Sequence, residues 1–420
     1  MKNRWLILSY FGNIDAMAPS HHIDDRIPYL SKKNVCIHFI TSPCGASLNK
    51  DLSHIRVPSI APSGIRYEVR YFLRKKTSNR FWFKFWEIIL LLPVYPFYFI
   101  EKIFLRLDTT WSWFISASVI ATLHAIKNRP TILYSTGGPV SAHIAAMIAS
   151  AITKIPYIAE FQDPLVHQYA APGKFERHFI RQVERLIFKT ANAVIFLTRQ
   201  AATNARERNK YNARAVSIYA GATPRKRIMT YSRGDSFNIA HFGSLGGSRN
   251  LSCFLKAWAA LLDEKLNMLG YLNLHLYGSD KKNLNRQREQ FKYSETIHIH
   301  GKIKRSEAIN LMGSVDVLLL IQNTDDVSFE TIPSKVFEYL HTGRPILALV
   351  FRNPELQAIL EEMGHIVVQA DDEVAVRRGL ETCIARWEQN KLRTSALESP
   401  YTVERAVDEL MMVATEVTSS

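Results

Sequence analysis

The sequence predicts an α/β protein made of two doubly wound parallel sheets. Short apolar runs, suited to strands buried on both faces, alternate with longer stretches that have helical periodicity. The runs fall into two series, and a polar, basic, turn-rich segment at 223–236 separates them. A chain of 420 residues is also too long for one hydrophobic core, so two or three domains are expected.

The two series of runs define the predicted domains. The first series predicts an N-terminal domain over 1–225, with strands at 4–11, 34–41, 131–136, 156–161, 192–198 and 215–220. The second predicts a domain over 235–395, with strands at 237–243, 272–278, 296–301, 315–321, 344–350 and 364–370. The remainder, 396–420, has the apolar spacing of an amphipathic helix. Because ligands of doubly wound sheets bind beyond the carboxyl ends of the strands, two such domains facing each other predict a ligand cleft.

One region, 81–107, belongs to neither series. It is very apolar and aromatic, but its uncharged core of Ile88 to Ile100 is short and holds two prolines. A spanning helix needs about 20 apolar residues. Lysines, arginines and tryptophans around the core indicate a segment that contacts an anionic membrane surface. A buried helix pair and a membrane span are the alternatives.

Composition restricts the kinds of partner. The chain carries 53 Lys and Arg against 38 Asp and Glu, which favours phosphate-rich partners. A nucleic-acid partner is not expected, since the chain has no zinc-knuckle, RNP-like or basic-aromatic motif. The four cysteines lack metal-ligand spacing, so we expect reduced thiols, no metal site and a cytoplasmic protein.

The stretch FETIPSKVFEYLHTGRPILAL, residues 329–349, gathers the strongest candidate functional residues. Ser334 is placed to cap a helix over about 335–342, and a helix start with Lys335 beside it favours a phosphate group. Glu338 lies one turn further on the same face, where a carboxylate suits sugar hydroxyls. Glu330 precedes the helix in the loop that follows the strand at 315–321. The stretch therefore predicts a site for a diphosphate flanked by hydroxylated rings, and a helix cap with two solvated glutamates is the alternative.

An ordered set of motifs resembles one known family. The Glu-x7-Glu arrangement of ETIPSKVFE resembles the donor-site motif of retaining glycosyltransferases of the glycogen-synthase-like, bacterial group 1 family, which have the GT-B fold of two Rossmann-like domains. HFGSLGGSRNLSCFLKA, LHLYGSD and IHIHGKIKRSEAINLMGSVDVLLL resemble successive segments of that family's C-terminal domain. YSTGGPVSAHIAA, PYIAEFQDP and ERLIFKTANAVIFLT resemble segments of its N-terminal domain. The resemblance covers most of 130–350.

The resemblance implies roles for matching residues in binding a nucleotide-sugar donor. Glu338 would hold the ribose, and Ser334 and Lys335 would contact the diphosphate. Glu330 would contact the transferred sugar. The remaining implied donor-site positions are Gly243, Ser244 and Arg249 near the diphosphate and Gly301 and Ile303 near the nucleobase.

On the acceptor side, Asp163 matches a polar position that faces the reaction centre. The acceptor would be a glycan or lipid-linked saccharide. The implied reaction is metal-independent sugar transfer with retention and no cofactor, in cell-surface polysaccharide or lipopolysaccharide biosynthesis, at the inner face of the membrane.

The sequence leaves two alternatives open. Ser244 stands where family members often have an arginine, which would suit a catalytically weakened scaffold or binding protein. Nucleotide-sugar 2-epimerases share the fold, but the motif order of that group is not seen in this sequence.

Overall fold

The structure is a computed structural model that describes residues 3–14, 17–46, 52–105, 107–166, 174–210, 214–225, 231–279, 281–392 and 398–419. Part of the expected linker, 226–230, and residue 106 of the apolar region lie outside the described residues. Two compact units are present: Met1–Tyr219 with Ala406–Ser420, and Ala220–Arg405.

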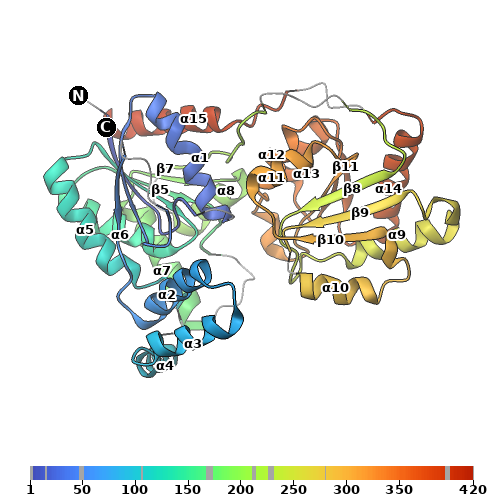
Figure 1. The fold of residues 1–420 in the computed structure, drawn as a ribbon. Helices are drawn as coiled ribbons and strands as arrows, with labels where there is room; N and C mark the ends of the chain where they lie inside the picture. The colour runs from blue at the N-terminus through green and yellow to red at the C-terminus, as the bar shows by residue number, and fades with distance from the viewer. Residues whose placement is uncertain are drawn as a thin grey trace. The chain divides into compact units, whose positions relative to one another are not determined.

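The first unit is a seven-stranded parallel sheet with the order β3-β2-β1-β4-β5-β6-β7 (Figure 1). Its strands are β1 (Arg4–Leu8), β2 (Cys36–Thr41), β3 (Ser53–Arg56), β4 (Ile132–Gly137), β5 (Tyr157–Phe161), β6 (Ala193–Phe196) and β7 (Arg214–Ser217). Its helices are α1 (Ala18–Lys32), α2 (Pro62–Lys76), α3 (Arg80–Leu91), α4 (Tyr95–Phe104), α5 (Trp113–Asn128), α6 (Val140–Thr153), α7 (Lys174–Thr190), α8 (Arg199–Asn209) and the C-terminal α15 (Val403–Ser419).

Helices cover both faces of the first sheet. One continuous core joins alternate side chains of the strands to α5, α6, α7 and α8. The α1 helix packs on the other face, where α15 lies beside it (Figure 1). An ion pair of 2.5 Å between Lys33 and Asp408 links α15 to the end of α1. The C-terminal amphipathic helix therefore completes the first unit.

The second unit is a six-stranded parallel sheet with the order β10-β9-β8-β11-β12-β13. Its strands are β8 (Phe237–Phe242), β9 (Leu272–Tyr277), β10 (Ile297–Gly301), β11 (Val317–Ile321), β12 (Ile346–Val350) and β13 (Ile366–Gln369). Its helices are α9 (Ser252–Glu264), α10 (Lys281–Glu289), α11 (Arg305–Met312), α12 (Lys335–Leu340), α13 (Pro354–Glu362) and α14 (Glu373–Glu388), with short 3₁₀ turns at Leu266–Met268, Ser294–Thr296 and Asp326–Phe329.

The topology of the second sheet locates its ligand-binding edge. The chain runs from β8 outward to β9 and β10, and then returns to β11 on the other side of β8. The connections therefore leave β8 and β11 in opposite directions, which opens a crevice at their carboxyl ends. The α9 and α14 helices share a core with one face of this sheet, which leaves the loops after β8, β10 and β11 to form the edge of the crevice.

The apolar region between β3 and β4 forms α3 and α4, and it is not a buried helix pair. Large apolar side chains from Phe81 to Phe104 are mostly exposed. Among the described residues, no single helix has the length and apolarity to cross a membrane. Together α3 and α4 reach the required length and composition, but the two helices are bent by 78°.

Candidate functional site

Lys335, the first residue of α12, reaches the carboxyl end of β8. Its Nζ donates a hydrogen bond of 2.9 Å to the carbonyl oxygen of Phe242 and lies 3.1 Å from Nε2 of His241. Gly243 has φ of +122° and lies against this ammonium. A Cβ at this position would lie only 3.1 Å from Nζ of Lys335. Glycine is therefore needed at 243 for both its backbone conformation and the close approach of the lysine.

His241 is fully buried on β8 and orients the lysine. Its Nδ1 lies 3.0 Å from the carbonyl oxygen of Leu319, which can only accept, so Nδ1 carries the proton and Nε2 accepts from Lys335. Burial and the adjacent ammonium hold the pKa of His241 well below its usual value. A neutral imidazole thus acts as a fixed acceptor for the Lys335 ammonium.

The local electrostatics of Lys335 are set by burial and by two charges. Burial, followed by the positive charge of Arg249, lowers the pKa of Lys335 well below its usual value, while Glu338 opposes that shift. Two positive side chains close together raise the local electrostatic potential, which favours the binding of an anion. The charges of Lys335 and Arg249 therefore suit the site to an anionic ligand.

Arg249 closes the glycine-rich turn after β8. The backbone N–H of Gly246 donates to the Arg249 carbonyl at 2.8 Å, and the Arg249 N–H donates to the Gly246 carbonyl at 3.2 Å. The hydroxyl of Thr324, after β11, donates to the Ser248 carbonyl in the same turn. Ser244 is exposed in this turn. Loops after β8 and β11 thus meet at the crevice that the topology predicts.

Glu338 lies one turn after Lys335 and is paired with Arg305, the first residue of α11. Arg305 Nε and Nη2 contact Glu338 Oε1 at 2.8 Å and 2.7 Å, and both side chains are about a quarter exposed or less. Both contacts are made to one carboxylate oxygen, Oε1. The buried residues of α12 are Val336, Phe337, Tyr339 and Leu340, which leaves Lys335 and Glu338 on the face toward the crevice.

Tyr339 fixes α12 against β8. Its hydroxyl oxygen accepts a hydrogen bond of 3.0 Å from the backbone N–H of Phe242. The expected Ser334 cap is wrong: the exposed Ser334 has helical backbone angles and makes no side-chain capping bond, and the helix ends at Leu340 rather than 342. Packing by Tyr339, rather than a cap, positions the start of α12.

Glu330 lies in a tightly held loop after β11. It is 7% exposed. Side-chain amides of Gln322 and Asn353 each donate to the carbonyls of Ser328 and Thr331, on either side of it. The loop is therefore fixed by hydrogen bonds from two neighbouring elements, which suits a residue that must hold one position.

Gly301 ends β10, and Ile303 lies in the segment that leads from it into α11. Gly301 has φ of +80°, and a Cβ on it would lie 2.5 Å from Cε of Lys281. Ile303 is partly buried two residues before Arg305 begins its helix. Asp163 belongs to the first unit, where it is exposed just after β5. The second unit thus brings together Lys335, Arg249 and Glu338 around the end of β8, while Asp163 lies on another body.

His241 and Arg305 were not among the residues singled out from the sequence. His241 gave a signal, since it is a polar residue near the end of a largely apolar strand, two positions before Gly243. Arg305 gave none, because its partner Glu338 lies 33 positions away.

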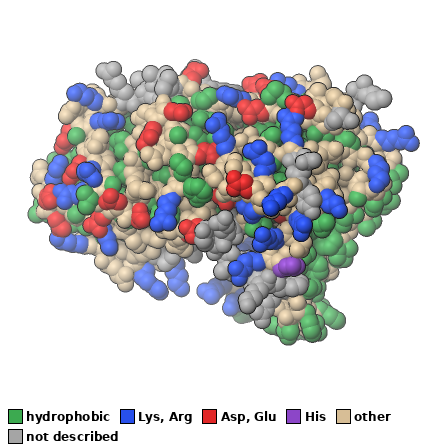
Figure 2. All heavy atoms as spheres, turned by 180° about the vertical axis from the view of Figure 1, so that it is seen from behind, with side chains coloured by type: hydrophobic (Ala, Val, Ile, Leu, Met, Phe, Trp, Pro, Cys, Tyr) green, Lys and Arg blue, Asp and Glu red, His purple; other side chains and the backbone are tan. Residues whose placement is uncertain are grey.

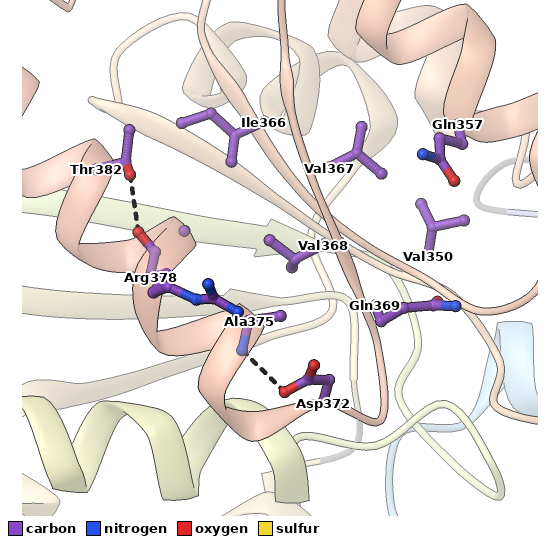
Figure 3. A pocket seen from close by; sticks show the side chains of 11 residues that line it. Val350, Gln357, Ile366, Val367, Val368, Gln369, Asp372, Ala375, Arg378 and Thr382 are labelled. Carbon is purple, nitrogen blue, oxygen red and sulfur yellow. Dashed lines mark hydrogen bonds between the residues drawn. The ribbon is translucent and has the colours of Figure 1, made fainter.

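A pocket elsewhere in the second unit does not share these residues (Figure 3). It lies between β13 and α14, and Gln369, Asp372 and Arg378 are among the residues that line it. Asp372 accepts from the Ala375 N–H to cap α14, and the Thr382 hydroxyl donates to the Arg378 carbonyl. These polar groups serve the helix, so we assign this pocket no ligand. Among the described residues no cluster of His, Cys, Asp and Glu could hold a metal ion.

Family models match both units. Residues 236–386 match the model described as glycosyl transferases group 1, and residues 89–221 match the glycosyl transferase 4-like domain. The chain belongs to the group 1 glycosyltransferases. No curated protein matches its sequence.

Several solved structures share the GT-B fold of this glycosyltransferase. HepE from Anabaena in complex with UDP is 14% identical, with a TM-score of 0.66, over 99% of this chain and 100% of its own. Sucrose-phosphate synthase from Thermosynechococcus elongatus is 11% identical, with a TM-score of 0.62, over 99% of this chain and 98% of its own. A putative UDP-N-acetylglucosamine 2-epimerase from Listeria monocytogenes is 12% identical, with a TM-score of 0.56, over 100% of this chain and 98% of its own. At these identities the likeness shows the fold alone.

Proposed function

We propose that this glycosyltransferase moves a sugar from a nucleoside-diphosphate sugar to a glycan or lipid-linked saccharide. The observation that carries the proposal is the ammonium of Lys335, held between His241 and the Phe242 carbonyl at the end of β8, with Arg249 as a second positive charge. Such fixed charges favour a diphosphate. We infer that the backbone at Gly243 and Ser244 and the hydroxyl of Ser334 also contact this group.

The remaining residues of the second unit are assigned to the rest of the donor. Glu338 would accept hydrogen bonds from the ribose hydroxyls through Oε2, because Arg305 occupies Oε1. Gly301 and Ile303 would contact the nucleobase, and Glu330 the transferred sugar. Uridine nucleotides are the first candidates, since solved structures of HepE contain UDP and UDP-glucose.

The proposed reaction is metal-independent transfer with retention. The bond between the sugar's anomeric carbon and the diphosphate breaks, and its electron pair goes to the diphosphate oxygen. Lys335 and Arg249 stabilise the negative charge that develops there, which is electrostatic catalysis by preorganised groups. The acceptor hydroxyl attacks the same face, and its proton passes to the departing diphosphate. Asp163, on the first unit, would contact the acceptor.

The proposed setting is cell-surface polysaccharide or lipopolysaccharide biosynthesis in the cytoplasm, at the inner face of the membrane. A lipid-linked acceptor agrees with the exposed apolar side chains of α3 and α4. The described cysteines are all free thiols, which agrees with a reducing compartment.

A donor panel tests the function. Binding of UDP-, GDP-, ADP- and TDP-sugars is measured by thermal shift, followed by assays of released nucleoside diphosphate. Glu338→Ala should abolish the stabilisation by the preferred donor, whereas Glu362→Ala, an exposed glutamate of α13, should preserve it. Release of an epimerised sugar instead of transfer would contradict the proposed reaction.

A scaffold without catalysis is the second candidate, favoured by the exposed Ser244 in the turn where family members often have an arginine. A folded protein that binds none of these sugars would favour this candidate over the transferase.

A further inference from the structure

The helix pair α3–α4 directs apolar side chains outward and acidic side chains inward, which is the reverse of a helix pair that faces water. Its outward side chains are large and apolar: Phe81, Trp82, Ile88, Phe97, Ile103 and Phe104 are each 50–75% exposed. Figure 2 shows hydrophobic side chains gathered at the lower right, where α3 and α4 lie. Proteins that are monomeric in water rarely expose a contiguous apolar patch of this kind.

The acidic side chains of the pair face inward. Glu87 is 8% exposed and forms an ion pair with Arg70 of α2. Glu101 is 7% exposed and accepts hydrogen bonds from the Ser63 N–H at 2.8 Å, the Ser63 hydroxyl at 2.5 Å and the Trp111 indole N–H at 2.7 Å. Specific polar contacts therefore hold α3 and α4 against the rest of the first unit. The fold thus fixes the outward direction of the apolar side chains.

The α5 helix carries a second exposed apolar stripe. Ile115, Val119, Leu123 and Ile126 recur at helical spacing and are 37%, 55%, 60% and 60% exposed. The opposite side of α5 is buried and packs against α6. In Figure 2 the hydrophobic surface continues from the lower right up the right-hand margin, where α5 lies. The stripe thus extends the apolar surface beyond α3 and α4.

Exposed basic side chains border this surface. Arg74, Lys75 and Lys76 end α2, and Arg80 and Lys84 follow on α3, all exposed. The one carboxylate within α2, Glu68, is buried. A lipid bilayer with anionic headgroups matches an apolar surface with a basic border. In a symmetric dimer that used this surface, the basic borders of the two copies would face and repel each other.

We propose that α3, α4 and the exposed stripe of α5 form one membrane-docking face for an anionic lipid bilayer. The apolar side chains of α3 and α4 enter the boundary between headgroups and acyl chains, the α5 stripe lies beside them, and the basic border contacts lipid phosphates. This surface does not depend on the proposed donor chemistry, because it involves none of the residues assigned to the donor.

Vesicle binding without nucleotide sugar tests the proposal on the full chain. Binding to phosphatidylglycerol–phosphatidylethanolamine vesicles should exceed binding to phosphatidylcholine vesicles about tenfold or more and should weaken with salt. Brominated lipids should quench Trp82 and Trp86, the two tryptophans whose side chains are strongly exposed. A folded protein that binds neither vesicle type, or that binds vesicles without quenching of its tryptophan fluorescence, would overturn the proposal.

Variants with matched controls locate the face. Phe97→Ser with Phe104→Ser should weaken binding about tenfold, whereas Leu266→Ser with Val374→Ser, equally exposed in the second unit, should leave it unchanged.

Arg74→Glu with Lys75→Glu should also weaken vesicle binding, unlike Lys256→Glu with Arg286→Glu. Val119→Ser with Leu123→Ser should weaken it about threefold. Equal binding by the variants and their controls would refute the face, and an unaffected α5 variant would remove α5 from it.

Discussion

Nζ of Lys335 lies 3.1 Å from Nε2 of His241, and the imidazole holds its proton on the far nitrogen. The lysine is thereby directed along the carboxyl edge of β8. This contact makes His241 a positioning residue for the proposed donor site and leads to the first prediction.

His241→Phe should weaken donor binding. The variant keeps a ring in the buried position but removes the acceptor for the ammonium, and a hydrogen bond to a charged group contributes about 1.5–3 kcal/mol. We expect the Kd for the preferred nucleotide sugar to rise about tenfold or more by isothermal titration calorimetry. His298→Phe, in the edge strand β10, is the control and should keep the wild-type Kd. An unchanged Kd for His241→Phe would show that Lys335 needs no such partner.

Donor affinity should fall as pH rises. Burial and the charge of Arg249 lower the pKa of free Lys335 well below its usual value. A bound diphosphate would raise that pKa, so binding is accompanied by proton uptake and is strongest where the lysine is already protonated. Titration over a broad pH range with an intact nucleotide sugar, whose diphosphate does not itself titrate near neutral pH, measures the effect.

Lys335→Met is the control for this pH dependence. It should bind the donor weakly and with an affinity that is flat over the same range. A wild-type affinity that rises with pH would contradict the assigned role of the ammonium.

Arg305→Ala should have a modest effect on donor affinity. The Arg305–Glu338 pair is partly exposed, and exposed ion pairs contribute about 0–1 kcal/mol. We therefore expect a rise in Kd of at most about fivefold, with Arg305→Lys intermediate. A loss as large as that of Glu338→Ala would mean that Arg305 itself contacts the donor.

The first unit contains a buried charge cluster that should dominate its stability. Glu160 and Arg26 are both 0% exposed and form an ion pair, and His22 lies 3.2 Å from Glu160. Burial disfavours the ionised carboxylate, but Arg26 and His22 outweigh it and hold the pKa of Glu160 below its usual value. Arg26→Met should lower the free energy of unfolding by about 3–5 kcal/mol, because it leaves a buried charge unpaired.

Urea denaturation followed by circular dichroism measures this loss. Adding Glu160→Gln to Arg26→Met should recover part of it, since the unpaired charge is then removed. Arg377→Met, which breaks exposed pairs with Glu264 and Glu381, should leave the free energy of unfolding nearly unchanged. A double variant no more stable than Arg26→Met alone would contradict the assignment of the cost to an unpaired charge.

The sequence predicted the strands well because buried parallel strands are continuous apolar runs. All twelve predicted runs contain strands, and the structure adds β3. That strand, SHIR, is at the sheet edge, with two exposed residues and no apolar run, so it gave no periodic signal. The family motifs located Lys335 and Glu338, but the pairing of Arg305 with Glu338 comes from tertiary contact between α11 and α12.

The orientation of the apolar region could not be read from composition either. Segment 81–107 suited a buried helix pair and a membrane-facing pair equally. The inward contacts of Glu87 and Glu101 decide which side of α3 and α4 faces outward, and those contacts involve Arg70, Ser63 and Trp111.

Lys335 is proposed to hold the diphosphate of a nucleotide sugar. The most direct test measures, by calorimetry, the affinity of the wild type, Lys335→Met and the exposed-lysine control Lys256→Met for UDP-glucose and the other UDP-sugars. At least one sugar should bind the wild type and the control equally and bind Lys335→Met at least about tenfold more weakly. Equal binding by all three proteins would contradict this role of Lys335.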